Sequence, residues 1–177
     1  TGLMIGEWFR QRLSGPMALD LHIGLDEKDL GRCAQMVPAR VKAGETGVPE
    51  SARAMMAAMQ DRSTPTGAAF QNPSQGPGYM NTERFRLAEL PSMNGHGTAR
   101  DLARLYAAIP DILPPPVLAE ATRIHSSGPD EVLLTHSQFG LGFMLHDEAA
   151  PIGVRSGSFG HAVDSHGGVP RIVREFE

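Results

Sequence analysis

The sequence is poor in cysteine and lysine, and each shortage excludes a class of chemistry. Cys33 is the single cysteine, so the chain cannot form an internal disulfide or a zinc set built on several thiols. We expect Cys33 to act as a small, buried apolar residue. Lys28 and Lys42 are the two lysines, and a Ser-x-x-Lys nucleophile pair needs a serine three positions before one of them. Leu25 and Ala39 occupy those positions, so no such pair is present.

Long hydrophobic runs and basic clusters are also lacking. No apolar run approaches the roughly 18 residues of a membrane span, and the N-terminus lacks a basic region followed by a hydrophobic block. We therefore expect no membrane span, and the compartment stays unknown, with the cytoplasm as the default. Sixteen basic and twenty acidic residues give a net charge of −4. Without a basic cluster to follow a phosphate backbone, nucleic acid is not an expected partner.

Glycine and proline are abundant instead. The chain holds 20 Gly and 14 Pro among 177 residues, which predicts many turns and a loop-rich fold. Hydrophobic residues make up 41% and charged residues 20%, and both shares are ordinary for a globular domain. The chain begins at Thr1 rather than Met, so we expect it to be a piece of a longer protein.

Apolar residues at helical spacing predict that the first part of the chain is mainly helical. Residues 3–13 form an amphipathic pattern that should end at Ser14-Gly15-Pro16. Further helices are expected over residues 27–36 (with Asp26 as the cap), 50–60, 99–109 and 116–125. The stretch 61–80 is dense in Ser, Thr, Pro and Gly and predicts a long loop.

The clearest local signal precedes the helix expected over residues 99–109. Thr98, followed three residues later by Asp101, resembles a capping box with an acidic residue in place of Glu or Gln. Losing this cap should cost about 1 kcal/mol. Farther along the chain, segments 139–145 and 153–163 read as strands. The expected order is therefore helices first and strands last.

Three patterns are candidates for chemistry, and each has a simpler interpretation. Tyr79-Met80-Asn81 matches a Tyr-x-Asn triplet, but it lies at the end of a Pro/Gly-rich stretch and can arise by chance. His161, Asp164 and His166 place three possible metal ligands within six residues, yet no HExxH motif and no second carboxylate at fixed helical spacing support a metal site. His96 lies between two glycines and is expected to shape a turn. No metal and no cofactor are therefore expected.

Several segments together resemble the superfamily of serine β-lactamases and penicillin-recognising hydrolases, in particular its class C-like esterases. The similar segments are GEWFRQRLSGPMALDLHIGL, FRLAELPSMNGHGTARDLARLYAAI, SSGPDEVLLTHSQFGLGFML and SGSFGHA. They follow one another in the family's order over about residues 2–162. The resemblance implies the C-terminal portion of that fold, because the family's Ser-x-x-Lys and its functional Tyr-x-Asn lie upstream of the first segment. Tyr79-x-Asn81 would then be a decoy.

The fold implied by this resemblance is α+β, a helical domain beside an antiparallel sheet, here incomplete and mostly helical with a few C-terminal strands. Over the whole chain, 1–177, it predicts a partial β-lactamase-like domain. Residues 1–125 would form the mainly helical part, and 135–165 would supply the strands that line the substrate groove. Residues 166–177 no longer resemble the family and form a divergent tail.

The resemblance also implies a role for His161. Phe159-Gly160-His161-Ala162 matches the opening of the family's third motif, so His161 would face the substrate and a following backbone N–H would help to hold the oxyanion. Val163 stands where the family has glycine. The implied function is part of a serine hydrolase acting on a small-molecule ester or β-lactam, with nucleophile and base outside this chain and no activity expected from it alone. The alternative is a noncatalytic helical binding or scaffolding module.

Overall fold

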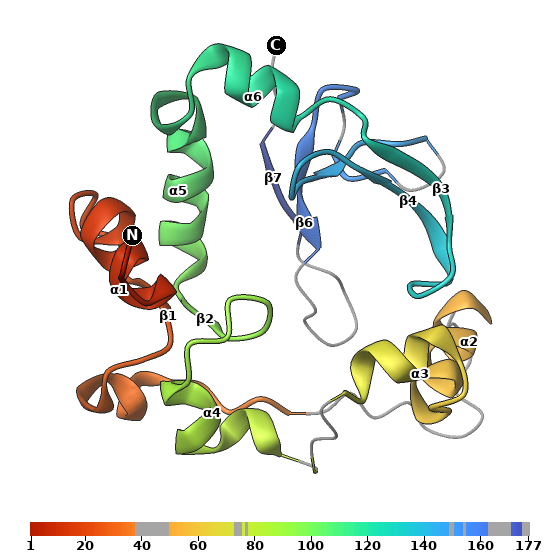
Figure 1. The fold of residues 1–177 in the computed structure, drawn as a ribbon, viewed down its shortest axis with the longest axis horizontal. Coiled ribbons are helices and arrows are strands. Elements are labelled where there is room, and N and C mark those ends of the chain that lie inside the picture. The colour runs from red at the N-terminus through yellow and green to blue at the C-terminus, as the bar shows by residue number, and fades with distance from the viewer. Residues whose placement is uncertain are drawn as a thin grey trace. The chain divides into compact units, whose positions relative to one another are not determined.

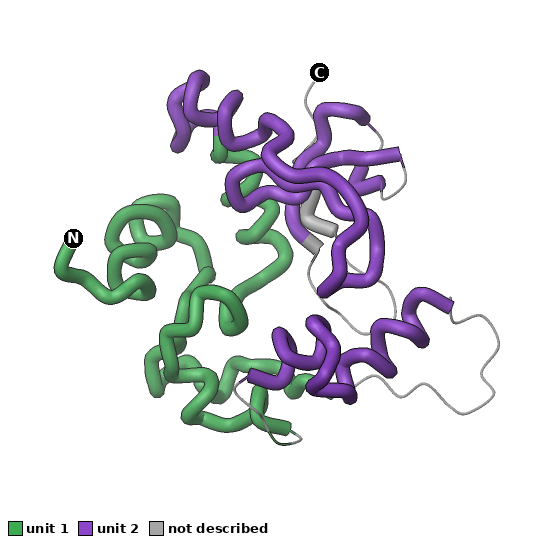
Figure 2. Tube along the Cα trace, turned by 45° about the vertical axis from the view of Figure 1, so that its right-hand side comes forward, with its two compact units in different colours: residues 1–37, 76–109 green, residues 38–75, 110–177 purple. Residues whose placement is uncertain are grey.

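The computed structural model describes residues 1–37, 50–72, 76, 78–148, 151–153, 155–162 and 171–174. Within it the chain divides into two compact units (Figure 2). Unit 1 comprises residues 1–37 and 76–109, and unit 2 comprises residues 38–75 and 110–177. The boundary falls inside helix α5 (Ala99–Ile112), between Ile109 and Pro110.

Unit 1 begins with the helix expected over residues 3–13. It forms as α1 (Ile5–Phe9), continues as the π-helix η1 (Arg10–Ser14), and ends where Gly15 donates its N–H to the carbonyl of Arg10 at 2.9 Å. A Cβ on Gly6 would lie 2.2 Å from the carbonyl oxygen of Ile23, so this helix can approach the following chain only because residue 6 is glycine.

The helix expected over residues 27–36 is shorter than predicted. It is the 3₁₀-helix η2 (Glu27–Arg32), and the side chain of Asp26 makes no capping hydrogen bond. The backbone closes the first turn instead, since Asp29 donates its N–H to the carbonyl of Asp26 at 2.9 Å. The carboxylate of Asp26 lies 3.5 Å from the ammonium of Lys28, in contact with a cation rather than with the helix N-terminus.

Two short strands, β1 (Leu21–Ile23) and β2 (Gly95–Gly97), pair antiparallel in unit 1. His96 was expected in a turn, but it lies in β2 directly opposite His22 of β1. A Cβ on Gly97 would lie 2.6 Å from the carbonyl oxygen of Asp20, so the close pairing requires glycine there. The tertiary pairing of two distant segments therefore overrides a local turn signal.

Helix α5 begins as predicted and ends later. Asp101 donates its backbone N–H to the hydroxyl oxygen of Thr98 at 3.1 Å, which confirms Thr98 as the cap. The reciprocal bond of a capping box is replaced, because the Asp101 carboxylate accepts from the Thr98 hydroxyl at 3.0 Å and the Thr98 N–H donates to the carbonyl of Asp20 at 3.3 Å. The helix was expected to end near residue 109 but includes Pro110 and runs to Ile112. A proline has no N–H and so removes one backbone hydrogen bond from a helix, but this helix continues for two residues after Pro110.

The helical part of unit 2 comprises α2 (Glu50–Gln60), α3 (Pro65–Phe70) and α6 (Pro115–Ala121). The first confirms the helix predicted over 50–60. The long loop predicted over 61–80 is wrong, because α3 lies within it. Thr64 caps α3 by accepting the N–H of Gly67 at 2.9 Å, and Pro65 occupies the first helical turn. The Thr-Pro pair that suggested a loop is therefore a helix start.

Unit 2 also holds a five-stranded antiparallel sheet in the order β3-β4-β5-β6-β7 (Figure 1). The strands are β3 (Ser126–Asp130), β4 (Thr135–Phe139), β5 (Met144–Leu145), β6 (Phe159–Ala162) and β7 (Arg171–Arg174). The strand predicted over 139–145 is interrupted because Gly142 has a φ of 82°. Among the described residues of the strand predicted over 153–163, those of β6 form a strand, and the helix predicted over 116–125 ends at Ala121.

The hairpin of β3 and β4 was not predicted. Its turn is held by Asp130, whose carboxylate oxygen Oδ1 accepts the N–H groups of Val132 at 2.9 Å and Leu133 at 2.8 Å. Thr66 of α3 is fully buried and donates its hydroxyl to the carbonyl of Val132 at 2.7 Å, which ties the helix to the hairpin. The architecture is thus α+β, with helices before an antiparallel sheet, and no helix in the described ranges is long and apolar enough to cross a membrane.

Candidate functional site

Strand β6 carries the segment that the sequence singled out around His161. It is hydrogen-bonded on both sides, with Phe159 opposite Leu145 of β5 and His161 opposite Ile172 of β7. Phe159 is 1% exposed, and its ring packs against that of Phe143 with centroids 4.7 Å apart. The strand is therefore anchored in the sheet at its N-terminal end.

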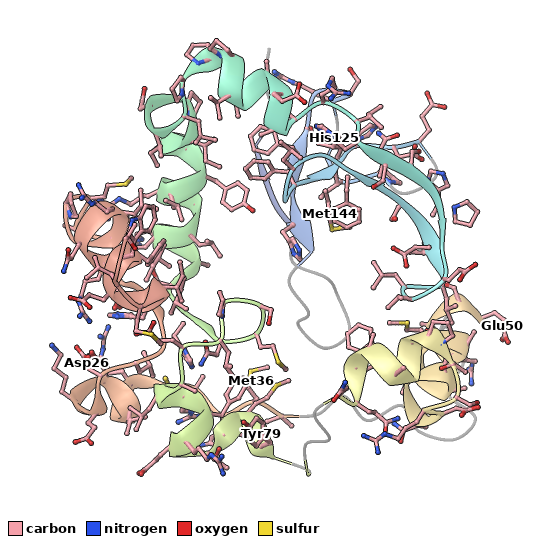
Figure 3. The ribbon with its side chains drawn as sticks, in the orientation of Figure 1. Asp26, Met36, Glu50, Tyr79, His125 and Met144 are labelled. Atoms are coloured by element: carbon pink, nitrogen blue, oxygen red, sulfur yellow. The ribbon has the colours of Figure 1, made fainter. Side chains whose placement is uncertain are left out.

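The side chain of His161 is exposed, in contrast to the buried residues that precede it. Side chains alternate between the two faces of a strand, so His161 lies on the same face as Phe159, one repeat farther along. Gly160 between them is buried and lies opposite Met144, which is labelled in Figure 3. A rigid strand thus presents an imidazole at a solvent-accessible position.

The predicted oxyanion contact and the metal site that was considered both depend on residues that follow β6. Val163, Asp164 and His166 lie outside the described residues. Within the described ranges, no group of three or more His, Cys, Asp or Glu side chains is arranged to hold a metal ion. The expectation that Val163 replaces a glycine next to an oxyanion therefore stays a prediction.

Tyr79 and Asn81 lie in unit 1, on the 3₁₀-helix η3 (Tyr79–Asn81), and Figure 3 labels Tyr79 and Met36. The carboxamide oxygen of Asn81 accepts the N–H of Met36 at 2.7 Å, and its NH₂ donates to the carbonyl of Met36 at 2.8 Å. The ring of Tyr79 packs edge-on against Phe85, with centroids 5.1 Å apart. The Asn81 side chain thus completes backbone hydrogen bonding, a structural role.

Serine hydroxyls near a base would indicate a nucleophile within the chain. Ser63 donates to Asp61 at 2.7 Å, Ser137 to Asp130 at 3.1 Å, and Ser127 to Gln138 at 3.2 Å. None of these three acceptors is a histidine or a lysine, the bases that activate serine in hydrolases. The recorded contacts of these hydroxyls stabilise turns and the hairpin of β3 and β4.

Sequence reasoning missed a polar network in unit 1. The carboxylate of Asp20 accepts from Arg32 and lies 3.0 Å from Nε2 of His22. The hydrogen bond from Arg32, followed by that from His22, holds the pKa of Asp20 below its ordinary value. The N–H of Asp20 donates to Asp101 at 3.1 Å, which links the network to the capped end of α5. Asp20, His22 and Arg32 lie close together in sequence, but the contact to Asp101 joins residues that are distant along the chain and no local motif indicates it.

Asn94 and Arg86 are the buried polar residues of the segment that leads to β2. Asn94 is 1% exposed; its carboxamide oxygen accepts the N–H of Leu90 at 3.0 Å, and its NH₂ donates to the carbonyls of Phe85, at 2.8 Å, and Ala88. Arg86 donates to the carbonyl of Ala34 at 3.0 Å. Asn94 is therefore an internal clamp that closes the backbone of the segment before β2.

The family model described as Beta-lactamase matches residues 4–171. This match extends past residue 162, where the quoted sequence resemblance ends, and reaches the first residue of β7. It includes β6 and His161. None of the curated proteins matches the chain.

Solved structures similar to the chain include EstA from Arthrobacter nitroguajacolicus Rue61a, with 26% identity and a TM-score of 0.70. A penicillin-binding protein homologue from Caulobacter crescentus has 29% identity and a TM-score of 0.69. A family VIII carboxylesterase has 25% identity and a TM-score of 0.67. These matches cover 91%, 90% and 90% of this chain, but only 42%, 41% and 40% of the three solved chains. The chain therefore spans about two fifths of their length.

Proposed function

Because this chain belongs to the β-lactamase family, we propose that it is a portion of a serine hydrolase that cleaves small carboxylic esters through an acyl-enzyme. One of the similar structures is a carboxylesterase and another is a penicillin-binding protein homologue. A β-lactam amide is the second substrate class. Strands within residues 135–165 line the substrate groove in this proposal, and residues 1–125 supply its helical support.

The observation that carries this proposal is the exposed side chain of His161 on a strand held from both sides. A positioned imidazole beside the reacting carbonyl can donate a hydrogen bond to charge that develops in the transition state. The burial of Phe159 fixes the strand, so that little reorganisation is needed when the substrate binds. His161 is thus the residue of this chain that we propose contacts the substrate.

The proposal assigns the attacking hydroxyl and its base to polypeptide outside this chain, because neither Lys28 nor Lys42 follows a serine at the required spacing. The chain alone should therefore release no p-nitrophenol from p-nitrophenyl butyrate above the buffer rate. It should also remain unlabelled by a fluorophosphonate, which reacts with activated serines. Turnover that the fluorophosphonate abolishes would contradict this assignment.

A chimera tests the positive part of the proposal. Residues 4–162 replace the matching segment of the family VIII carboxylesterase, and hydrolysis of p-nitrophenyl butyrate is measured. We expect activity, and we expect His161→Ala to lower kcat about 100-fold, as loss of a transition-state hydrogen bond does. The matched control is His125→Ala, which changes a histidine of the same unit outside β6 and should leave kcat unchanged.

Two outcomes would contradict the proposal. If the His161→Ala chimera is as active as its parent, His161 has no role in the reaction. If the chimera folds, as judged by circular dichroism, but is inactive while the parent carboxylesterase is active, the noncatalytic binding module becomes the better interpretation. The capped and amphipathic helix α5 is the feature that such a module would use.

A further inference from the structure

A groove of about 550 Å³ lies in unit 2, between α6 and the turn that joins β4 to β5. Val117 and Ala121 line it from α6, and Leu141 and Phe143 line it from the turn. Val117 is 50% exposed and Leu141 is 55% exposed, so both leave apolar surface open to solvent. A space of this size is typical of sites for small molecules.

The two walls of the groove are fixed to each other through the backbone. Leu141 donates its N–H to the carbonyl of Ala121 at 2.8 Å. A Cβ on Gly140 would lie 2.1 Å from that same carbonyl oxygen, so this close approach requires glycine. The ring of Phe143 packs against the buried ring of Phe159. The groove is therefore formed before a ligand binds, and binding requires little reorganisation.

The groove adjoins His161 on one face of the sheet. Met144 of β5 lies opposite Gly160 of β6. The hairpin continues to Phe143, whose carbonyl accepts the N–H of Gly140 at 2.8 Å. The antiparallel register, extended by this one residue, places Phe143 opposite His161. Residues that lie directly opposite share a face, with Cβ atoms about 5 Å apart. One lining residue of the groove is thus the cross-strand neighbour of His161.

The groove offers a ligand apolar surface without a free charge. Glu120 is the ionisable residue of the lining, and its carboxylate accepts two hydrogen bonds from Arg123, at 3.0 and 2.7 Å. These bonds hold the pKa of Glu120 below its ordinary value, and the carboxylate also lies 3.3 Å from Nε2 of His125. Since this charge is already paired, an uncharged alkyl chain suits the groove better than an ionic group.

We propose that this groove binds the aliphatic acyl chain of the ester. The inference rests on the proposed function, in which His161 contacts the substrate. An ester held at that imidazole extends its acyl chain across the ring of Phe143 and between Val117 and Leu141. These contacts remove alkyl surface from water, which favours longer acyl chains. The groove therefore sets the preference for acyl length and takes no part in the chemical step.

The test is an NMR titration of the chain with methyl butyrate, methyl hexanoate and methyl octanoate, following the methyl resonances of Leu141. We expect saturable shifts and an affinity that rises by up to about four-fold for each added methylene. Val117→Asp places a charge in the groove and should weaken the binding of methyl octanoate by about ten-fold or more. The matched control is Ala119→Asp, which changes an exposed residue of α6 outside the lining and should leave the affinity unchanged.

Three results of the titration would overturn the proposal. They are the absence of a saturable shift with methyl octanoate, an affinity that does not change with acyl length, and equal affinity in the unmodified chain and in Val117→Asp, with both folded by circular dichroism. The titration detects binding without turnover, so failure of the groove and failure of the proposed hydrolysis give different results.

Polypeptide outside this chain is the other possible occupant, and the chimera with the carboxylesterase tests it. There, Val117→Asp should lower the hydrolysis of p-nitrophenyl octanoate relative to that of p-nitrophenyl acetate, whereas Ala119→Asp should not. If Val117→Asp instead lowers the melting temperature of the chimera and leaves this ratio unchanged, packed polypeptide fills the groove and the proposal is wrong.

Discussion

The two units satisfy their backbone polar groups in different ways. In unit 1, β1 and β2 pair over three residues each, and buried side chains supply much of the remaining hydrogen bonding. Asn94 binds three backbone groups, and Arg86 and Asp101 each bind at least one more. In unit 2, five strands form one antiparallel sheet, and the ring of Phe159 in this sheet packs against that of Phe143.

This difference predicts which kind of substitution destabilises each unit most. Where the strand ladder is short, polar side chains complete the backbone hydrogen bonding, and the loss of one leaves a buried group unpaired. Where the ladder is extended, apolar packing carries the stability, and the loss of a ring leaves a cavity. Buried polar residues are therefore the critical positions of unit 1, and buried aromatic residues are those of unit 2.

The largest effect is expected from Phe159→Ala in unit 2. Removing this ring, which is 1% exposed, leaves a cavity beside Phe143 and should lower the free energy of unfolding by about 4 kcal/mol. Urea unfolding followed by circular dichroism measures the change. Phe70→Ala is the matched control because Phe70 is 49% exposed, and it should cost far less. Equal losses in the two variants would mean that Phe159 is not part of a packed core.

A somewhat smaller loss is expected from Asn94→Ala in unit 1. The substitution leaves the N–H of Leu90 and the carbonyl of Phe85 without their partner, which should cost about 3 kcal/mol. The same urea titration applies, with Asn72→Ala as the control because Asn72 is exposed. If Asn94→Ala is as stable as the control, buried polar side chains are not what stabilises unit 1.

Thr98→Ala tests a capping hydrogen bond at the N-terminus of α5 rather than a buried polar side chain such as Asn94. It removes the hydroxyl that accepts the N–H of Asp101, and the free energy of unfolding should fall by about 1 kcal/mol. Thr98→Ser keeps the hydroxyl and should recover most of that loss. A serine variant as unstable as the alanine variant would assign the effect to packing of the methyl group instead of to the cap.

The smallest effect is a pH dependence in unit 1. Burial lowers the pKa of His96, the charges of Arg86 and His22 add to the lowering, and a hydrogen bond to the carbonyl of Asn94 opposes it. The folded state thus favours neutral His96, so this contribution to stability is complete above the ordinary value near 6.5. It is lost progressively as the pH falls from there toward the lower folded pKa.

His96→Gln should therefore flatten the decline in stability below pH 6.5, while leaving the pH dependence above that value unchanged. Urea midpoints measured at several pH values for both proteins give the comparison. His22 lies opposite His96 on β1, so the double variant shows whether the two side chains act together. An unchanged slope in His96→Gln would show that burial of this imidazole does not affect folding.

Local signals in the sequence were sufficient where a few neighbouring residues decide the structure. The cap at Thr98 and the start of α5 follow from side chains within one turn, and both were predicted. The same reasoning failed for α3, because Thr64-Pro65 fits a loop and a helix start equally well. It also failed for the hairpin of β3 and β4, whose Ser, Gly and Pro residues have low strand propensity.

At the candidate site, too, local patterns were recognised in the sequence and long-range contacts were not. The strand around His161 was recognised from the order of its residues, and β6 indeed includes it. The contact that joins Asp20 to the start of α5 at Asp101 was not predicted, because the two residues are distant along the chain. Spacing in sequence carries no information about which of these distant groups will meet.

The sequence by itself determined the family, the order of helices before strands and the capped start of α5. These properties depend on residue identity and short-range spacing. Only the tertiary structure decided that His96 pairs with His22 and that Asn94 is a buried clamp. The physical reason is that burial and hydrogen-bond partners depend on long-range contacts, which form when the chain folds and are not specified by neighbours in sequence.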